Sequence, residues 1–108
     1  MVRFKMVKET DKEEIYEYYP EDSRFKGILS KDKKSGKVKL VKQAKNDHWV
    51  IITKEMDQES IDNWNLSRKE DGLRPIKRKA KEMKWLRYAE HAVTAIERGE
   101  KEGIVMWY

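Results

Sequence analysis

The sequence predicts an α+β domain, in which an antiparallel meander of four to six strands carries one long amphipathic C-terminal helix on a face, followed by a closing strand. Three observations predict this class. The first half of the chain alternates apolar and charged residues, residues 76–98 have helical periodicity, and GIVMWY at 103–108 has the composition of a strand. Because 108 residues suffice for one domain and not for two, we expect a single domain over residues 1–108.

Short-range patterns predict the first two strands. In VRFKMVK, Val2, Phe4 and Met6 alternate with Arg3 and Lys5, which places the apolar side chains on one face. TDKEE is typical of a turn. IYEYY is rich in β-prone residues, and the proline that follows it closes the segment.

A hairpin is the strongest local signal. FKGILSKDKKSGKVKLVK has two β-rich arms around DKKSG, where Gly36 can adopt the positive φ of a tight turn. Val38 and Leu40 alternate with Lys37 and Lys39, so one face of the second arm is apolar. HWVIIT then forms a short apolar run, and we expect a strand buried on both faces.

Residues 55–75 are ambiguous and predict a helix of two or three turns. Asp57 is a candidate cap, and Ile61, Trp64 and Leu66 would give the helix an apolar side. DGLRP contains the glycine and proline that end it.

Residues 76–98 predict the long helix. Pro75 suits a helix start, and Gly99 suits the position after a helix end. On a helical wheel the apolar residues form one stripe, with Tyr88 at its edge and with Glu90 and His91 on the opposite side. The stripe consists of Trp85, Leu86, Ala89, Ala92, Val93 and Ile96.

Composition excludes several classes of site. The chain has no cysteine, so thiolate nucleophiles, disulfides and thiolate metal sites are absent. Its N-terminal residues have no apolar run of signal-peptide length, and the longest uncharged apolar run, IVMWY, is far too short for a membrane helix. We therefore expect a soluble cytoplasmic protein with no membrane partner.

No catalytic, metal or cofactor motif emerges. KKSGK lacks the spacing of a phosphate-binding loop, and no GxSxG is present. The two histidines, His48 and His91, together with Tyr88 and Glu90, are the candidates for a site assembled from separate segments. Ala95 occupies the position where a zinc helix would need a second ligand to His91. We expect no catalytic residue, no bound metal and no cofactor, and therefore no enzyme.

Two segments are strongly basic. Residues 24–45 carry nine lysines and arginines against Asp32 alone, and residues 68–87 carry nine against three acids. Both are candidates for contact with a nucleic-acid backbone, although surface lysines also protect strands and helices from aggregation. The candidate residues are Lys26, Lys33, Lys34, Lys37, Lys39, Arg74, Lys77, Arg78 and Lys81.

Three segments carry a resemblance. YYPE at 18–21, YAEHA at 88–92 and GIVMWY at 103–108 resemble a family of small uncharacterised proteins from low-GC Gram-positive bacteria. Residues 55–75 look like an addition to that pattern. The resemblance implies a bacterial cytoplasmic protein and carries no activity over to this chain.

These observations favour a non-enzymatic module that binds a protein partner or itself. Tyrosine and tryptophan are more abundant than a small core can bury. GIVMWY would pack in the core as an internal strand, or would make a dimer contact at a sheet edge. The alternative function is nucleic-acid binding through the two basic segments.

Overall fold

The computed structural model describes residues 1–107. By their contacts, the residues divide into unit 1, which comprises Met1–His48 and the chain from Leu86 onward, and unit 2, which comprises Trp49–Trp85. The expectation that residues 1–108 act as one domain stays a prediction.

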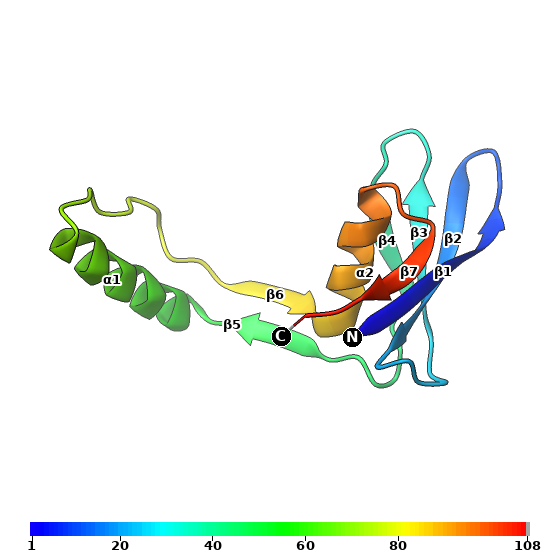
Figure 1. Ribbon diagram of the computed structural model, residues 1–108, viewed down its shortest axis with the longest axis horizontal. Helices are drawn as coiled ribbons and strands as arrows, with labels where there is room; N and C mark the ends of the chain where they lie inside the picture. The colour runs from blue at the N-terminus through cyan, green and yellow to red at the C-terminus, as the bar shows by residue number, and fades with distance from the viewer. Residues whose placement is uncertain (108) are drawn as a thin grey trace. The chain divides into compact units, whose positions relative to one another are not determined.

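Unit 1 is built on a five-stranded antiparallel sheet with the strand order β4-β3-β2-β1-β7. Helix α2 packs on this sheet, and β7 closes the chain beside β1 (Figure 1). The predicted α+β class, with a meander sheet, a packed helix and a closing strand, is confirmed. The elements are β1 (Val2–Glu9), β2 (Glu13–Pro20), β3 (Gly27–Asp32), β4 (Val38–Lys42), α2 (Arg87–Glu97) and β7 (Glu102–Val105).

The core lies between α2 and one face of the sheet. The sheet supplies large side chains, among them Phe4, Tyr16 and Tyr18, all almost completely buried. The facing side of α2 supplies small ones, and its buried residues are Ala89, Ala92, Ala95 and Ile96. Alanines let the helix approach the sheet closely, so that the rings fill the space between the two layers.

Gly27 is required by the packing of Tyr18. A Cβ atom at Gly27 would lie 2.0 Å from Tyr18 Cε1 and 2.7 Å from the backbone oxygen of Lys42. Neither the buried ring nor the neighbouring strand can move enough to accept it. β3 therefore begins with glycine, the one residue type that leaves room for the Tyr18 ring at this position.

The predicted hairpin is confirmed, with β3 and β4 as its arms and Gly36 at φ +75° in its turn. The predicted helix over 76–98 is wrong in its first half. Met83–Leu86 form strand β6, which contains Trp85, and the helix begins only at Arg87. Its end agrees with the prediction, because Gly99 has φ +102° and donates its N–H to the Ile96 oxygen at 3.0 Å.

Unit 2 contains helix α1 (Lys54–Glu70), while β5 (Trp49–Ile52) pairs with β6 in a separate two-stranded sheet. The predicted burial of HWVIIT on both faces is wrong, since Trp49 is 49% exposed and Ile51 is 53% exposed. α1 is longer than expected, and its cap is Thr53, which accepts the Met56 N–H. Asp57 instead binds the segment that follows the helix, through the Arg78 side chain and the Lys81 N–H.

None of the helices found in residues 1–107 combines the length and the apolar character that crossing a membrane requires.

Candidate functional site

The start of α2 is fixed by Asp47, which lies in the loop after β4. Its buried carboxylate accepts hydrogen bonds from the backbone N–H groups of Tyr88 at 3.0 Å and Ala89 at 3.1 Å, and from the Tyr18 hydroxyl at 2.9 Å. Leu86, which precedes the helix, has no side-chain acceptor for these N–H groups. Asp47 therefore caps α2 from a distant part of the sequence and determines where the helix begins.

Four rings gather beside this cap, and we call His48, Tyr88, His91 and Trp107 the aromatic corner. The Tyr88 ring lies 6.0 Å from His48 and 5.6 Å from Trp107, between ring centroids. His91 stacks on Trp107 with centroids 3.9 Å apart and planes inclined by 13°. His91 is thus half-buried, whereas the helical wheel placed it on the solvent side.

A tight turn after β2 adjoins the aromatic corner. Glu21 and Asp22 both have φ of 54°, a left-handed conformation that is unfavourable for residues with a Cβ. Glu21 accepts the Tyr88 hydroxyl at 2.9 Å, and Asp22 accepts Arg3 Nε at 2.6 Å. These two bonds hold the turn in its strained form and link it to α2 and β1.

The rings of the aromatic corner contact one another by stacking and by edge contacts. Burial lowers the pKa of the His91 imidazole, the Glu90 charge raises it, and the Arg87 charge lowers it. Within residues 1–107 no three histidine or carboxylate side chains come together as a metal-binding group. The site roles expected for His48, Tyr88, Glu90 and His91 stay predictions.

The basic candidates of unit 1 are partly neutralised. Lys26 forms an ion pair with Glu17, and Lys33 pairs with Glu9 at 3.1 Å. Lys34 and Lys37 lie in the turn between β3 and β4, and Lys39 lies on β4. Only part of the charge of residues 24–45 is therefore free to meet an external anion.

The other basic candidates lie in unit 2, on the segment that follows α1. Arg78 is committed to the buried Asp57, which it contacts through both guanidinium nitrogens at 2.6 and 2.9 Å. The guanidinium, together with the Lys81 N–H, lowers the pKa of Asp57 to about 2. Arg74, Lys77 and Lys81 are exposed.

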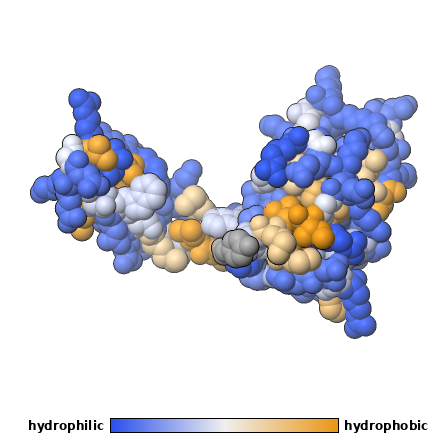
Figure 2. Space-filling model, viewed as in Figure 1, coloured by the Kyte–Doolittle hydropathy of each residue, from blue (hydrophilic) through white to orange (hydrophobic). Residues whose placement is uncertain are grey.

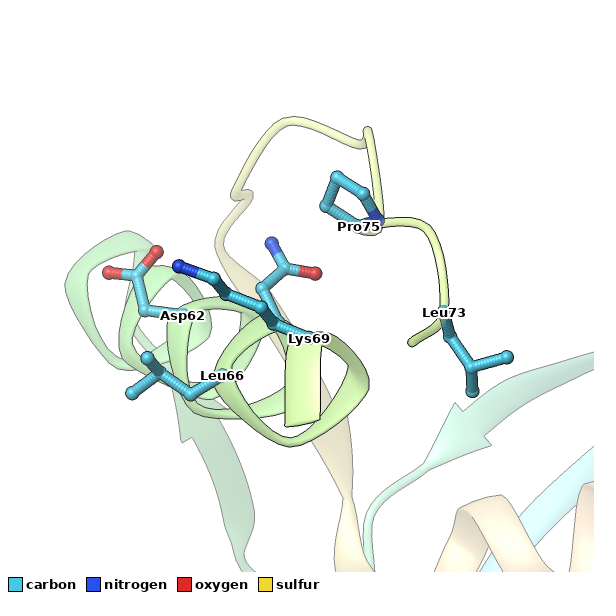
Figure 3. Close-up of a pocket in the computed structure, with 6 residues that line it drawn as sticks. Asp62, Leu66, Lys69, Leu73 and Pro75 are labelled. Atoms are coloured by element: carbon cyan, nitrogen blue, oxygen red, sulfur yellow. The ribbon is translucent and has the colours of Figure 1, made fainter. Parts of the chain in front are cut away.

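A groove on α1 was not predicted from the sequence. It has a volume of about 480 Å³ and is lined by Asp62, Asn65, Leu66, Lys69, Leu73 and Pro75. Figure 3 shows that Asp62, Leu66 and Lys69 come from the helix, whereas Leu73 and Pro75 come from the loop after it. Leu66 and Leu73 are more than half exposed. The only sequence signal for this groove was the apolar residues on either side of DGLRP.

The two edges of the main sheet differ in chemistry. At one edge, β4 carries Lys39 and Lys42, and its Val38 N–H donates to the Glu97 carboxylate of α2 at 3.3 Å. At the other edge, residues 102–107 contain no lysine, and Ile104 and Met106 are 56% and 70% exposed. Figure 2 shows hydrophobic surface over β7.

Comparisons of the chain with family models, with curated proteins and with solved structures give no match. The resemblance carried by YYPE, YAEHA and GIVMWY stays a prediction.

Proposed function

We propose that this protein is a self-association module, in which β7 pairs with β7 of a second copy. The observation that carries the proposal is the contrast between the two sheet edges. Natural proteins protect exposed edges with lysine, proline or a covering element, because unpaired N–H and C=O groups invite another strand. β4 has lysines and a carboxylate from α2, whereas β7 has neither along Glu102–Val105.

The side chains of β7 suit an antiparallel pairing with an identical strand. Centred on Ile104, such a pairing sets Ile104 against Ile104 of the second copy and Glu102 against Met106. No like charges then face each other, and an apolar pair occupies the two-fold axis.

The neighbouring strand supports the same arrangement. On β1, Arg3 lies opposite Ile104 and Lys5 lies opposite Glu102. The positive charge of Lys5 therefore partly offsets the negative charge of Glu102, the one acidic residue among residues 102–107. A second strand meets a surface that is close to neutral at its centre.

The short length of β7 sets the strength of the association. A pairing of four or five residues lies at the small end of specific interfaces. We expect a dissociation constant of about micromolar order, and therefore a reversible homodimer.

The test compares two charge substitutions at equally exposed positions on opposite edges. Ile104 on β7 and Val41 on β4 are both 56% exposed. Ile104→Glu places like charges against each other on the two-fold axis, while Arg3 keeps the monomer stable. Val41→Glu introduces the same charge where lysines already lie nearby.

Sedimentation velocity over a wide concentration range gives the readout, with circular dichroism to show that both variants keep the fold. The wild type and Val41→Glu should dimerise with similar affinity, and Ile104→Glu should stay monomeric. A wild type that stays monomeric throughout, or a dimer lost in Val41→Glu and kept in Ile104→Glu, contradicts the proposal.

A further inference from the structure

The segment after α1 is a strap clamped to the helix by polar groups. The Asn65 side chain accepts the Ile76 N–H at 2.7 Å, Arg68 Nε donates to the Arg74 oxygen at 2.6 Å, and Asp57 binds Arg78 and the Lys81 N–H. We use the name strap for residues 74–84. Its backbone is held along α1 at three separate points.

This clamping sorts the strap side chains into two rows. Ile76, Arg78 and Ala80 lie against α1 or line cavities beside it. The alternate positions are lysines, and all of them are exposed: Lys77, Lys79 and Lys81. These three exposed lysines alternate along the chain with the residues that face α1, and we call them the lysine row.

The strap is strongly basic for its length. Residues 74–84 carry six lysines and arginines against Glu82 alone, and only Arg78 among the six is engaged with a carboxylate of the described residues. A single strand of nucleic acid carries one phosphate per nucleotide, so neighbouring lysines of the strap can each meet a phosphate. Neutralising several of these phosphates releases counterions, which is the main source of affinity for such ligands.

The two flanks of the strap are different. On one flank, Ser60, Ile61 and Trp64 of α1 form a cavity of about 230 Å³ with Ile76 and Arg78, and the Trp64 side chain is 66% exposed. On the other flank, the three acids Glu55, Glu59 and Asp62 and a single lysine, Lys54, line a cavity together with Ala80. The first flank offers a ring on which a base can stack, and the second repels phosphate.

From this arrangement we infer that unit 2 binds single-stranded nucleic acid, with phosphates along Lys77, Lys79 and Lys81 and a base stacked on Trp64. The acidic flank fixes the side on which the strand lies, because a strand placed there would meet three carboxylates. The site uses no residue of β7, so it is independent of the proposed self-association.

The experiment measures fluorescence anisotropy of a labelled oligothymidylate, with the full chain, at low salt and along a salt series. Lys77→Gln/Lys79→Gln/Lys81→Gln removes the lysine row and leaves the Lys81 backbone bond to Asp57 intact. Lys34→Gln/Lys37→Gln/Lys39→Gln is the matched control, since it removes the same charge from exposed positions of unit 1. Trp64→Ala tests stacking separately from charge.

The strap triple variant should bind at least about tenfold more weakly, and its slope of log K against log salt should fall by about 2, as expected for three lost phosphate contacts. Trp64→Ala should weaken binding by about tenfold, while the unit 1 triple variant binds like the wild type. Ile104→Glu should also bind like the wild type.

Three results overturn the inference. One is equal binding by the wild type and the strap triple variant. Another is an equal loss in the unit 1 triple variant. The third is displacement by polyglutamate as effective as displacement by unlabelled oligothymidylate, with Trp64→Ala unchanged, because the strap would then attract any polyanion.

Discussion

The two units are held together by different interactions. Unit 1 buries a cluster of eleven residues between its sheet and α2. In unit 2, Ile61 is the one buried hydrophobic residue within the described chain, and polar contacts from Asp57, Asn65 and Arg68 fix its strap. The stabilisation from burying apolar side chains increases with the buried area and gives a cooperative core. Hydrogen bonds and ion pairs to water-exposed groups add little net stability.

This difference predicts different behaviour. Unit 1 should unfold in one cooperative transition. Unit 2 should open locally at a lower free-energy cost, because few apolar contacts resist its opening. A segment of this kind can adapt to a ligand, which suits the site that we infer on the strap.

The largest effect is expected in the core of unit 1. Phe4→Ala removes a ring that is 1% exposed and should lower the free energy of unfolding by about 4 kcal/mol. Chemical denaturation followed by circular dichroism measures this change. Phe25→Ala is the control, since Phe25 is 38% exposed, and it should cost about 1 kcal/mol or less. An equal loss of unfolding free energy in both variants would contradict the placement of the core between α2 and the sheet.

The next effect concerns the cap of α2. Asp47→Ala removes the acceptor of the Tyr88 and Ala89 N–H groups and should destabilise unit 1 by about 2 kcal/mol. Thermal and chemical denaturation provide the readout. Asp11→Ala, at an exposed turn position, should change stability by no more than about 0.5 kcal/mol. An Asp47→Ala protein as stable as Asp11→Ala would refute the capping role.

A smaller effect compares two glycines with the same backbone conformation. Gly36 in unit 1 has φ +75° and Gly72 in unit 2 has φ +73°, and a Cβ at either meets open space. Gly36→Ala should lower the global free energy of unfolding by about 1 kcal/mol, from left-handed strain alone. Gly72→Ala should leave the global transition unchanged and speed hydrogen exchange in α1. Equal shifts of the global transition would mean that the two units unfold together.

The smallest effect is a loss of stability that is limited to unit 2 and occurs only at low pH. The pKa of Asp57 is lowered to about 2, below the value of about 3.9 for an unperturbed aspartate. Its contribution to stability is therefore complete above about pH 4 and is lost as the pH falls through about 2. Hydrogen exchange of α1 amides should accelerate across this window in the wild type. Asp57→Asn, which carries no titrating charge, should lack the step, and an identical step in both proteins would exclude Asp57 as its source.

Sequence patterns predicted unit 1 well because the secondary structure that its local sequence favours is also the one that its packing requires. The alternation of Val2, Phe4 and Met6, the turn glycine Gly36 and the helix end at Gly99 are each specified by neighbouring residues. The α2 cap was missed because Asp47 lies about forty positions before the helix. The ring contacts of the aromatic corner were missed for the same reason, since His48 and Trp107 come from distant segments.

Unit 2 was predicted less well because few of its residues are buried. Pro75 suits a helix start, and this signal supported a helix over residues 76–82 that does not form. Asn65 and Asp57 bind the backbone of Ile76 and Lys81, and these long-range bonds hold the segment against α1 without a regular helix. The basic candidates in both segments could be named from the sequence. Only the structure distinguished the lysine row on the strap from Lys26, Lys33 and Arg78, which are already paired.

Hydrogen–deuterium exchange at low and high protein concentration tests the central claim most directly. If β7 pairs with β7 of a second copy, the amides of residues 102–106 should gain protection as the concentration rises, and those of β4 should not change. Protection of β7 that is independent of concentration, or a gain that appears at β4 instead, would contradict the proposed self-association.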